Sequence, residues 1–420
     1  MTTDVFEMLE SNVRSYCRHF PNLFSKAAGA MLQDQSGNRY IDLLAGAGTL
    51  NYGHNNPAII EPVIEYLRDG GIVHSLDLHT EAKAGFLEAL ERVILAPRGL
   101  RYKVQFPGPT GTNAVEAALK LARKVTGRRN VVAFTNGYHG MSLGALAATA
   151  NPAKRAGAGV PLGNTTFLPY DGYLGTEIDT ADLASRLSQC KGGGVDAPAA
   201  FIVETVQGEG GLWHCRPEWL RKISELAKEI GALLIVDDIQ AGCGRTGSFF
   251  SFEGSGVVPD IVTLSKSLSG FGTPLAVVLL KREFDRWAPG EHNGTFRGNN
   301  LGFVGATAAI NAYWTDNGFA NEIGQKASFL RARLEKIVSK FPSGTVSIRG
   351  RGLFTGLAFT DVTMAQSLSQ ELYHRGVIAE TCGPNDEVLK FLPPLTIETE
   401  TLSLALDKLE AIGAVSAVAA

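Results

Sequence analysis

Cysteine is scarce in this chain of 420 residues, and its placement gives no sign of a structural framework. The five cysteines are Cys17, Cys190, Cys215, Cys243 and Cys382, and no two of them form a CxxC pair. Disulfide frameworks and cysteine-based metal sites rely on such spacings, so neither is indicated. We expect reduced and mostly packed thiols in a cytoplasmic protein, with no metal ion at its functional site.

Long hydrophobic runs and an excess of one charge are also missing. The longest apolar run, Leu275 to Leu280, is far too short to span a bilayer. The stretch MTTDVFEMLESNVR carries acidic residues early and has no apolar core, which argues against a secretory signal. Lys and Arg number 39 against 42 Asp and Glu, so the net charge is only -3. We therefore expect neither nucleic acid nor a membrane as a partner.

The sequence does contain a regular alternation of short apolar runs and helical patterns. Strands are expected at residues 102–106, 131–134, 199–204, 233–238, 260–266 and 276–281. These runs are continuously hydrophobic, which is typical of strands buried on both faces of a mostly parallel sheet that helices cover. The sequence therefore predicts an α/β fold.

The pattern changes in the last quarter of the chain. A long amphipathic helix is marked by Ile323, Leu330, Leu334 and Ile337. A strand at GLFTGLAF, a helix at residues 365–375 and a strand at GVIAET follow. Because a chain of 420 residues is too long to fold around one ordinary hydrophobic core, we expect more than one domain. The expected segments are residues 1–55, packing with the small domain, residues 56–315, the large domain, and residues 316–420, a small α+β domain.

Polar side chains stand where five of the predicted strands stop. The runs end at the stretch from Thr135 to Gly140, at Glu204, at Asp237-Asp238, at Ser265-Lys266 and at PGPTGT, residues 107–112. In open parallel sheets, ligands bind at the carboxyl ends of the strands. One such ending means little by itself, but five together predict a single crevice.

The PGPTGT stretch allows two interpretations. A turn followed by a helix N-cap is the commoner one. Backbone N–H groups at a helix start also favour an anion such as phosphate. The sequence has no GxxxxGK[ST] motif of a P-loop and no GxGxxG after a first strand, so nucleotide sites of these kinds are not indicated. A monophosphate on an organic cofactor fits better.

Asp237, Lys266 and Tyr138 each have an ordinary role and a chemical one. Asp237 can be a helix cap or a salt-bridge partner, but a buried carboxylate is costly unless it meets a cation such as a protonated pyridine nitrogen. Most lysines lie at the surface, yet one at the end of a buried strand can serve as a Schiff-base nucleophile. Tyr138 can pack in a core or stack on a planar cofactor. A carboxylate, a lysine and an aromatic ring, together with a phosphate site, are the groups that pyridoxal phosphate requires.

Several motifs together resemble the class III pyridoxal-phosphate aminotransferases. They are PTGTNAVEAALKLAR, NGYHGMSLGAL, VETVQGEGG, LLIVDDIQAGCGRTG, TLSKSLSGFGTPLA, NGTFRGNN and IRGRGLFTGL, in the order seen in that family. The resemblance runs from about Ala30 to the C-terminus. It implies fold type I, with a mostly parallel seven-stranded sheet in the large domain and a smaller α+β C-terminal domain. It also implies a homodimer, or a higher homo-oligomer, whose active sites are shared between subunits.

The resemblance implies a role for each matching residue. Lys266 corresponds to the lysine that bonds to the cofactor, Asp237 to the aspartate facing the pyridine nitrogen, and Gln240 to the glutamine near the ring hydroxyl. The other implied cofactor contacts are Gly111 and Thr112 at the phosphate, Tyr138 stacked on the ring with His139 beside it, and Thr295 at the phosphate of the neighbouring subunit.

The substrate pocket departs from the family pattern. Met141 stands where family members commonly have an arginine that grips a substrate carboxylate, and Lys390 stands where relatives acting on ornithine have another. The substrate candidates are therefore Glu209, Lys390 and Arg297, followed by Arg155. The basic residues among them can equally form salt bridges between subunits.

Further stretches resemble one branch of the family. FPNLFSKAAGA, RAGAGVPLGN, PYDGYLG and EHNGTFRGNN are similar to enzymes that move the amino group of L-glutamate to L-aspartate 4-semialdehyde. The products are L-2,4-diaminobutyrate and 2-oxoglutarate, used in ectoine biosynthesis and also in making siderophores. A Glu209–Lys390 pair that opens and closes could admit both substrates.

Three alternatives stay open from the sequence. An ornithine or 4-aminobutyrate ω-aminotransferase is the nearest, and Met141 and Lys390 argue against it. The family also contains racemases and mutases, such as glutamate-1-semialdehyde aminomutase. A catalytically dead binding or scaffold protein would be expected to lose the lysine or the aspartate, and Lys266 and Asp237 are both present.

Overall fold

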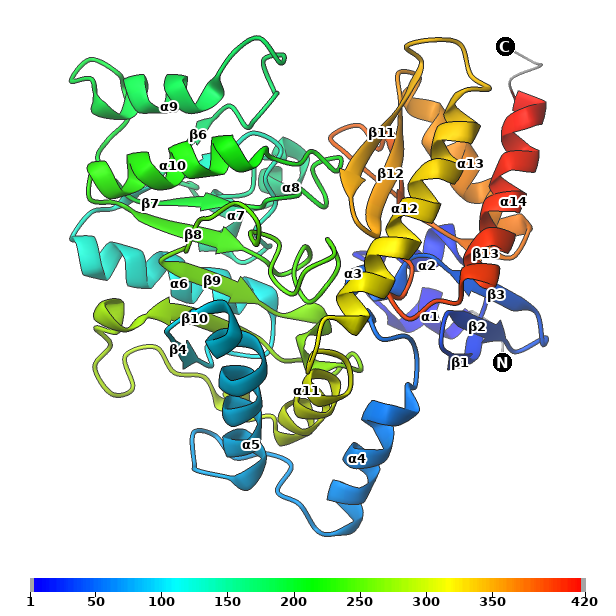
Figure 1. Ribbon diagram of the computed structural model, residues 1–420, viewed down its shortest axis with the longest axis horizontal. Coiled ribbons are helices and arrows are strands. Elements are labelled where there is room, and N and C mark those ends of the chain that lie inside the picture. Colours follow the sequence, from blue (N-terminus) through cyan, green and yellow to red (C-terminus); the bar gives the residue numbers. More distant parts are fainter. Residues whose placement is uncertain (1–3, 417–420) are drawn as a thin grey trace.

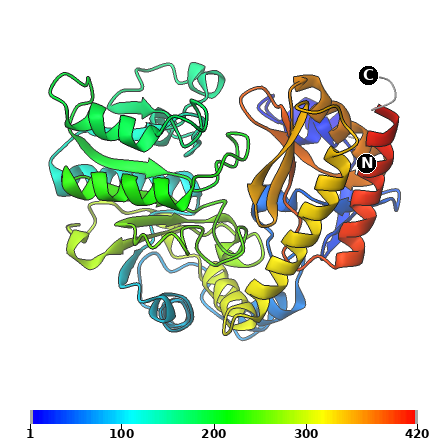
Figure 2. The ribbon, with the colours of Figure 1, turned by 45° about the horizontal axis from the view of Figure 1, so that its top comes forward.

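The protein consists of two parts that lie side by side. The computed structural model describes residues 4–416. Figure 1 shows a larger part built around a central sheet and a smaller part near which both ends of the described chain lie. The turned view of Figure 2 shows helix α12 (Gly318–Val338) beside α14 (Thr399–Ser416) in the smaller part. The smaller part thus combines segments from both ends of the sequence.

The large sheet has the order β4-β10-β9-β8-β7-β5-β6 among the described residues. Its strands are β4 (Tyr102–Gln105), β5 (Asn130–Phe134), β6 (Thr165–Leu168), β7 (Pro198–Val203), β8 (Leu233–Asp237), β9 (Ile261–Leu264) and β10 (Val277–Lys281). Strand β10 runs opposite to the other six strands, which all point the same way. The prediction of a mostly parallel seven-stranded sheet is confirmed.

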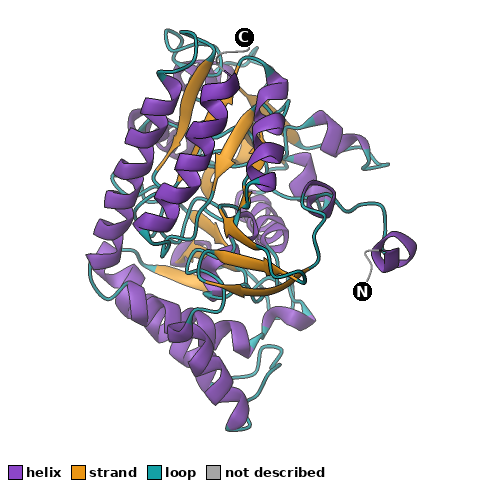
Figure 3. Ribbon diagram, turned by 90° about the vertical axis from the view of Figure 1, so that its right-hand side faces the viewer, coloured by secondary structure: helices purple, strands orange, loops and turns teal. Residues whose placement is uncertain are grey.

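Helices cover both faces of this sheet, which explains why its central strands are continuously hydrophobic. Side chains of β8 alternate between two core clusters. Leu234 and Val236 pack with α10 (Pro217–Glu229), whereas Leu233 and Ile235 pack with α6 (Gly111–Thr126). Figure 3 shows helices flanking the strands. The sheet is therefore fixed from both sides, and its strand ends are held in register.

Other helices connect and surround these layers. They are α1 (Asp4–Leu9), α2 (Tyr16–His19), α3 (Ala45–Gly48), α4 (Pro57–Arg68), α5 (Glu81–Ala89), α7 (Leu143–Ala147), α8 (Pro152–Ala156), α9 (Thr180–Gln189) and α11 (Asn300–Tyr313). Within residues 4–416, none of the helices is both long and apolar enough to cross a membrane.

The smaller part contains two four-stranded sheets and the helices α12, α13 (Val362–His374) and α14. The first sheet has the order β1 (Phe24–Ala28), β2 (Met31–Asp34), β3 (Arg39–Asp42), β13 (Val377–Ile378). The second has the order β11 (Val346–Arg351), β12 (Phe354–Phe359), β15 (Val388–Phe391), β14 (Glu380–Cys382). The single strand expected at GVIAET is wrong, because β13 joins the first sheet and β14 joins the second.

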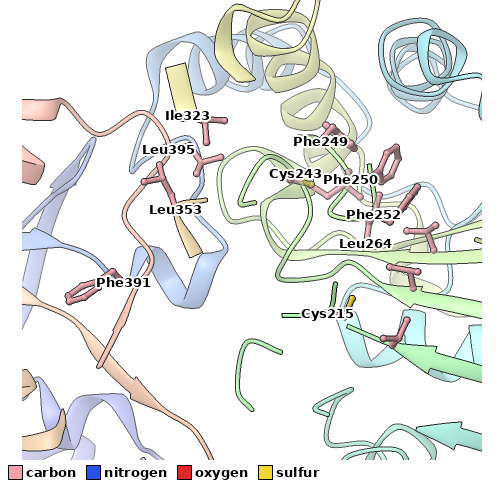
Figure 4. Close-up of a cluster of buried hydrophobic side chains, with 14 of the residues drawn as sticks. Cys215, Cys243, Phe249, Phe250, Phe252, Leu264, Ile323, Leu353, Phe391 and Leu395 are labelled. Carbon is pink, nitrogen blue, oxygen red and sulfur yellow. The ribbon is translucent and has the colours of Figure 1, made fainter. Parts of the chain in front are cut away.

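The two parts share one hydrophobic core. Figure 4 shows Phe249 and Phe250 from the larger part near Ile323, Leu353 and Leu395 from the C-terminal segment. A fully buried guanidinium, that of Arg245, crosses the same boundary. It donates hydrogen bonds to the carbonyl oxygens of Leu353 and Pro393 and to the side chain of Asn51. These contacts hold the smaller part against the strand ends of the large sheet.

Candidate active site

A cavity of about 880 Å³ lies at the carboxyl ends of the strands of the large sheet. The segments after β4, β5, β7, β8 and β9 all reach it, as the polar strand ends predict. The eight predicted site residues that line it are Gly111, Thr112, Tyr138, His139, Glu209, Asp237, Gln240 and Lys266. A cavity of this size can hold a cofactor and a small substrate together.

Lys266 begins the turn that follows β9. Its φ of 50° is in the left-handed region, which is uncommon for a residue with a side chain and concentrates at functional sites. Its Nζ donates a hydrogen bond to the carbonyl oxygen of Ala47, 2.9 Å away. Burial lowers the pKa of the Lys266 amine, although the carboxylate of Glu209 acts against this. The amine is therefore more easily deprotonated than a surface lysine.

Asp237 and His139 form a buried pair at the end of β8. The Asp237 carboxylate is 2.7 Å from Nδ1 of His139 and also accepts a hydrogen bond from the Thr263 hydroxyl at 3.1 Å. Burial opposes the charge on His139, but the hydrogen bond and charge of Asp237 outweigh it and raise the pKa of His139. The adjacent Asp238 is fully buried, accepts from the backbone N–H of Ser251 and does not line the cavity. Of the two aspartates, only Asp237 can meet a ligand.

The N-terminus of α6 points into the cavity at Gly111 and Thr112. The first N–H groups of a helix have no partner within it, and the helix dipole favours an anion there. A Cβ atom on Gly111 would lie 3.0 Å from Cδ1 of Ile239, so the backbone passes close to the segment that follows β8. The Thr112 hydroxyl is 2.6 Å from that of Ser142, which in turn donates to Glu116. This segment therefore has the features that a phosphate cradle requires.

Tyr138 and Gln240 hold positions beside these groups. The backbone N–H of Tyr138 donates to Glu204 Oε1 at 2.8 Å, and the Lys154 ammonium lies over its ring at 5.4 Å from the centroid. Gln240 Nε2 donates to the carbonyl oxygen of Ala47 at 2.9 Å, as Lys266 does. Ala47 itself has a φ of 56°, so an unusual turn of the N-terminal segment presents one acceptor to both side chains.

Lys390 lies between two carboxylates behind the cavity. It belongs to β15 and is fully buried. Its Nζ is 3.0 Å from Oε1 of Glu209 and 2.9 Å from Oε1 of Glu380. Burial acts against the charge of Lys390, but the two carboxylates outweigh it and raise its pKa. Burial raises the pKa of Glu380, whereas the charges of Lys390 and Lys266 overcome burial and lower that of Glu209.

Several residues at the cavity were not assigned a role from the sequence, among them Glu380, Glu204 and Tyr16. Glu380 pairs with Lys390, and that contact depends on the pairing of β14 with β15. Glu204 accepts from the backbone N–H groups of Tyr138 and Gly208, and burial raises its pKa to about 7. The position of Glu204 at the end of a predicted strand was the one feature of the sequence that could have indicated a role at the site. Tyr16 lines the cavity from α2, far away in the sequence, and no pattern indicated it.

Thr295 and Arg297 lie apart from the cavity of their own chain. The carbonyl oxygen of Thr295 accepts from Nε2 of His74 at 2.8 Å, and Arg297 pairs with Asp77 at 3.0 Å. The Thr295 side chain is exposed. The Arg155 guanidinium packs over Phe167 and does not line the cavity either.

The side chains present fit pyridoxal phosphate. A buried carboxylate held by His139 suits a protonated ring nitrogen, the start of α6 suits a phosphate, and Lys266 supplies a primary amine between them. By contrast, within residues 4–416 no three His, Cys, Asp or Glu side chains gather in a way that could hold a metal ion.

Comparison with known proteins gives a family and several relatives. The family model described as aminotransferase class-III matches residues 14–412. A diaminobutyrate–2-oxoglutarate transaminase of Bordetella parapertussis is 54% identical over 412 residues, covering 98% of this chain and 95% of the relative. Another, of Nocardia farcinica, is 55% identical over 404 residues, covering 96% and 92%.

Solved structures resemble the whole chain as well. The ornithine aminotransferase of Toxoplasma gondii ME49 has a TM-score of 0.85 at 25% identity, covering 99% of this chain and 96% of its own. Another structure of the Toxoplasma gondii enzyme, with a TM-score of 0.83 at 26% identity, is described as holding pyridoxal phosphate at partial occupancy in its active site. It covers 98% of this chain and 93% of its own.

Proposed function

The chain belongs to the class III aminotransferase family, and on this premise we propose that it moves the amino group of L-glutamate to L-aspartate 4-semialdehyde. The products are L-2,4-diaminobutyrate and 2-oxoglutarate. The observation that carries the reaction class is the meeting of Lys266 and the Asp237–His139 pair in one cavity. Relatives named diaminobutyrate–2-oxoglutarate transaminase, after the two products of this reaction, are more than half identical over nearly the whole chain and support the choice of substrates.

The cofactor of the proposed reaction is pyridoxal phosphate. When bound, it supplies the carbonyl that receives the amino group and a ring that accepts electrons from the breaking C–H bond. Gly111 and Thr112 would hold its phosphate, Tyr138 would cover one ring face, and Gln240 would lie near the ring hydroxyl. Asp237, oriented by His139, would keep a proton on the ring nitrogen.

Lys266 moves the proton in this proposal. Its Nζ would take the proton from the substrate Cα and then, as a general acid, return it to the cofactor carbon. Burial lowers the pKa of this amine, so a larger share of it is neutral and able to accept a proton near neutral pH. The hydrogen bond to the carbonyl oxygen of Ala47 gives the side chain a defined resting direction. Glu209 lines the cavity and is proposed to meet the far end of the substrates, whereas Lys390 lies behind it and pairs with both Glu209 and Glu380.

We propose a homodimer with shared active sites. Thr295 is exposed and does not line the cavity of its own chain, so the phosphate contact implied for it would be made in a partner subunit. Exposed apolar side chains stand on its own segment and on the segment that contacts it, namely Phe296 on the first and Ile72, Leu76 and Leu78 on the second. The two segments are joined by the hydrogen bond between His74 and the carbonyl oxygen of Thr295 and by the ion pair between Asp77 and Arg297. Cytoplasmic location, and service in ectoine or in siderophore synthesis, stay predictions.

Stopped-flow absorbance of the purified enzyme with bound cofactor tests the reaction. We expect the visible absorption of the cofactor to fall with glutamate alone and to return with aspartate 4-semialdehyde. The Lys266→Ala variant is the control and should show neither change at a comparable rate. Return with succinic semialdehyde or glutamate semialdehyde instead would move the assignment to the 4-aminobutyrate or ornithine branch. No response to glutamate in the wild type would contradict an aminotransferase that uses this donor.

A further inference from the structure

The two carboxylates that contact Lys390 are held in different ways. Glu380 is the direct partner of Lys390 in the antiparallel pairing of β14 with β15, so the sheet fixes the distance between them. Glu209 belongs to the segment after β7, in the larger part of the molecule. The Glu380 side chain is 8% exposed, against 27% for Glu209. Both carboxylates line the cavity, but Glu380 is held against Lys390 by the sheet, whereas Glu209 is the more exposed of the two.

Lys390 needs a counter-ion at all times because its side chain is fully buried. An uncompensated charge in such a place is strongly destabilising. With Glu209 as its only carboxylate, Lys390 would bind Glu209 permanently, and neither would be free for a substrate. With Glu380 on the same strand pair, Lys390 keeps a carboxylate within 2.9 Å when Glu209 turns away.

The charges around Lys390 and its two carboxylates agree with different roles for Glu380 and Glu209. Burial and the nearby charge of Glu209 raise the pKa of Glu380, while Lys390 lowers it. When the Glu209 charge leaves Lys390, one cause of the raised Glu380 pKa is removed, and Glu380 becomes a better counter-ion. Other groups also act on this cluster. The charge of Lys266 acts on both carboxylates, that of Lys154 acts on Glu209, and the thiol of Cys382 and the phenol of Tyr16 face the cluster as well.

We propose that Glu380 is the standing counter-ion of Lys390, which frees Glu209 to bind the ammonium group of an amino-acid aldehyde. This inference rests on the proposed function, because L-aspartate 4-semialdehyde carries an ammonium group at the end away from its aldehyde. Succinic semialdehyde has the same chain without that group. Glu380 is therefore a positioning residue that acts through Glu209 on the choice of acceptor.

The Glu380→Gln variant tests this role. Glutamine keeps the shape but removes the charge, so Lys390 must retain Glu209, which is then withheld from the substrate. We measure kcat/KM for aspartate 4-semialdehyde and for succinic semialdehyde with glutamate as donor. The ratio of the two values is expected to fall at least about tenfold from that of the wild type. Glu387→Gln is the matched control, because Glu387 directly precedes β15, pairs with Arg349 of β11 and does not line the cavity. That variant should keep the wild-type ratio.

A double variant separates the counter-ion role from mere support of the fold. In Glu380→Gln with Lys390→Met, nothing holds Glu209, so the preference for the ammonium-bearing aldehyde is expected to return. An unchanged ratio in Glu380→Gln, or a double variant without the preference, would overturn the inference. If Glu380→Gln does not fold, the double variant alone still decides, since it should prefer aspartate 4-semialdehyde as the wild type does. A wild-type enzyme that does not accept aspartate 4-semialdehyde would overturn the proposed function, and this inference with it.

Discussion

At the scale of single residues, the buried His139–Asp237 pair carries a prediction about pH. The raised pKa of His139 means that the folded protein holds this proton more tightly than the unfolded chain does. The stabilisation is fully present below the unfolded pKa of about 6.5 and is lost as the pH rises through the folded-state value. We expect His139→Asn to lower the free energy of unfolding by about 1.5–3 kcal/mol at pH 5.5.

The loss caused by His139→Asn should become smaller toward pH 9. Urea unfolding of the cofactor-free protein between these pH values measures it. His374→Asn is the control, because His374 is exposed at the end of α13 and should show no such trend. A difference between wild type and His139→Asn that does not vary with pH would show that the pair is not ionic.

Residues at strand ends could be placed from the sequence, and residues brought in by tertiary pairing could not. Lys266 and Asp237 follow continuous apolar runs, and a parallel sheet brings such ends to one edge. Glu380 reaches the site only through the pairing of β14 with β15, and Tyr16 only through the folding of the N-terminal segment. No local pattern marks either residue. The catalytic and binding roles of all these residues stay predictions.

At the scale of elements, the N-terminus of α6 is expected to determine how tightly the cofactor binds. In Gly111→Ala the new Cβ would lie 3.0 Å from Ile239, a residue that also lines the cavity. Such overpacking costs about 1–3 kcal/mol. The dissociation constant for pyridoxal phosphate should therefore rise at least about fivefold, measured by titrating the cofactor-free protein.

A second glycine variant controls for the added methyl group. Gly85 lies inside helix α5, and a Cβ there would meet nothing within 4 Å. Gly85→Ala should leave the affinity for pyridoxal phosphate unchanged and raise the free energy of unfolding by about 0.5–1 kcal/mol. Equal affinities in Gly111→Ala and the wild type would argue against a phosphate site at the start of α6.

Elements with a clear apolar pattern were predicted, and mixed ones were missed. The six strands expected in the large sheet are present because helices cover both faces of their apolar runs. Strand β6 was not predicted, because it lies at the edge of the sheet, where only Leu168 is buried, and its sequence has no continuous apolar run. Strand β15 contains Lys390, and β11 contains two arginines that interrupt its pattern. The domain bounds at residues 55 and 315 stay predictions.

At the scale of the whole molecule, the proposed homodimer depends on the exposed apolar surface around Thr295. Phe296 is 67% exposed there, and contact with a second copy would bury it. We expect Phe296→Asp to disrupt association, because a carboxylate would have to be buried without a partner. Light scattering after size-exclusion chromatography should give twice the chain mass of 44.8 kDa for the wild type and one chain mass for the variant.

The same substitution should also weaken cofactor binding, because Thr295 of each subunit is proposed to contact the partner's phosphate site. Leu404→Asp is the matched control, since Leu404 is 50% exposed on α14, in the smaller part. That variant should remain dimeric and keep the wild-type affinity for pyridoxal phosphate. A monomeric wild type would contradict the proposed assembly. A monomeric Phe296→Asp variant with unchanged affinity would instead separate association from the active site and remove the role proposed for Thr295.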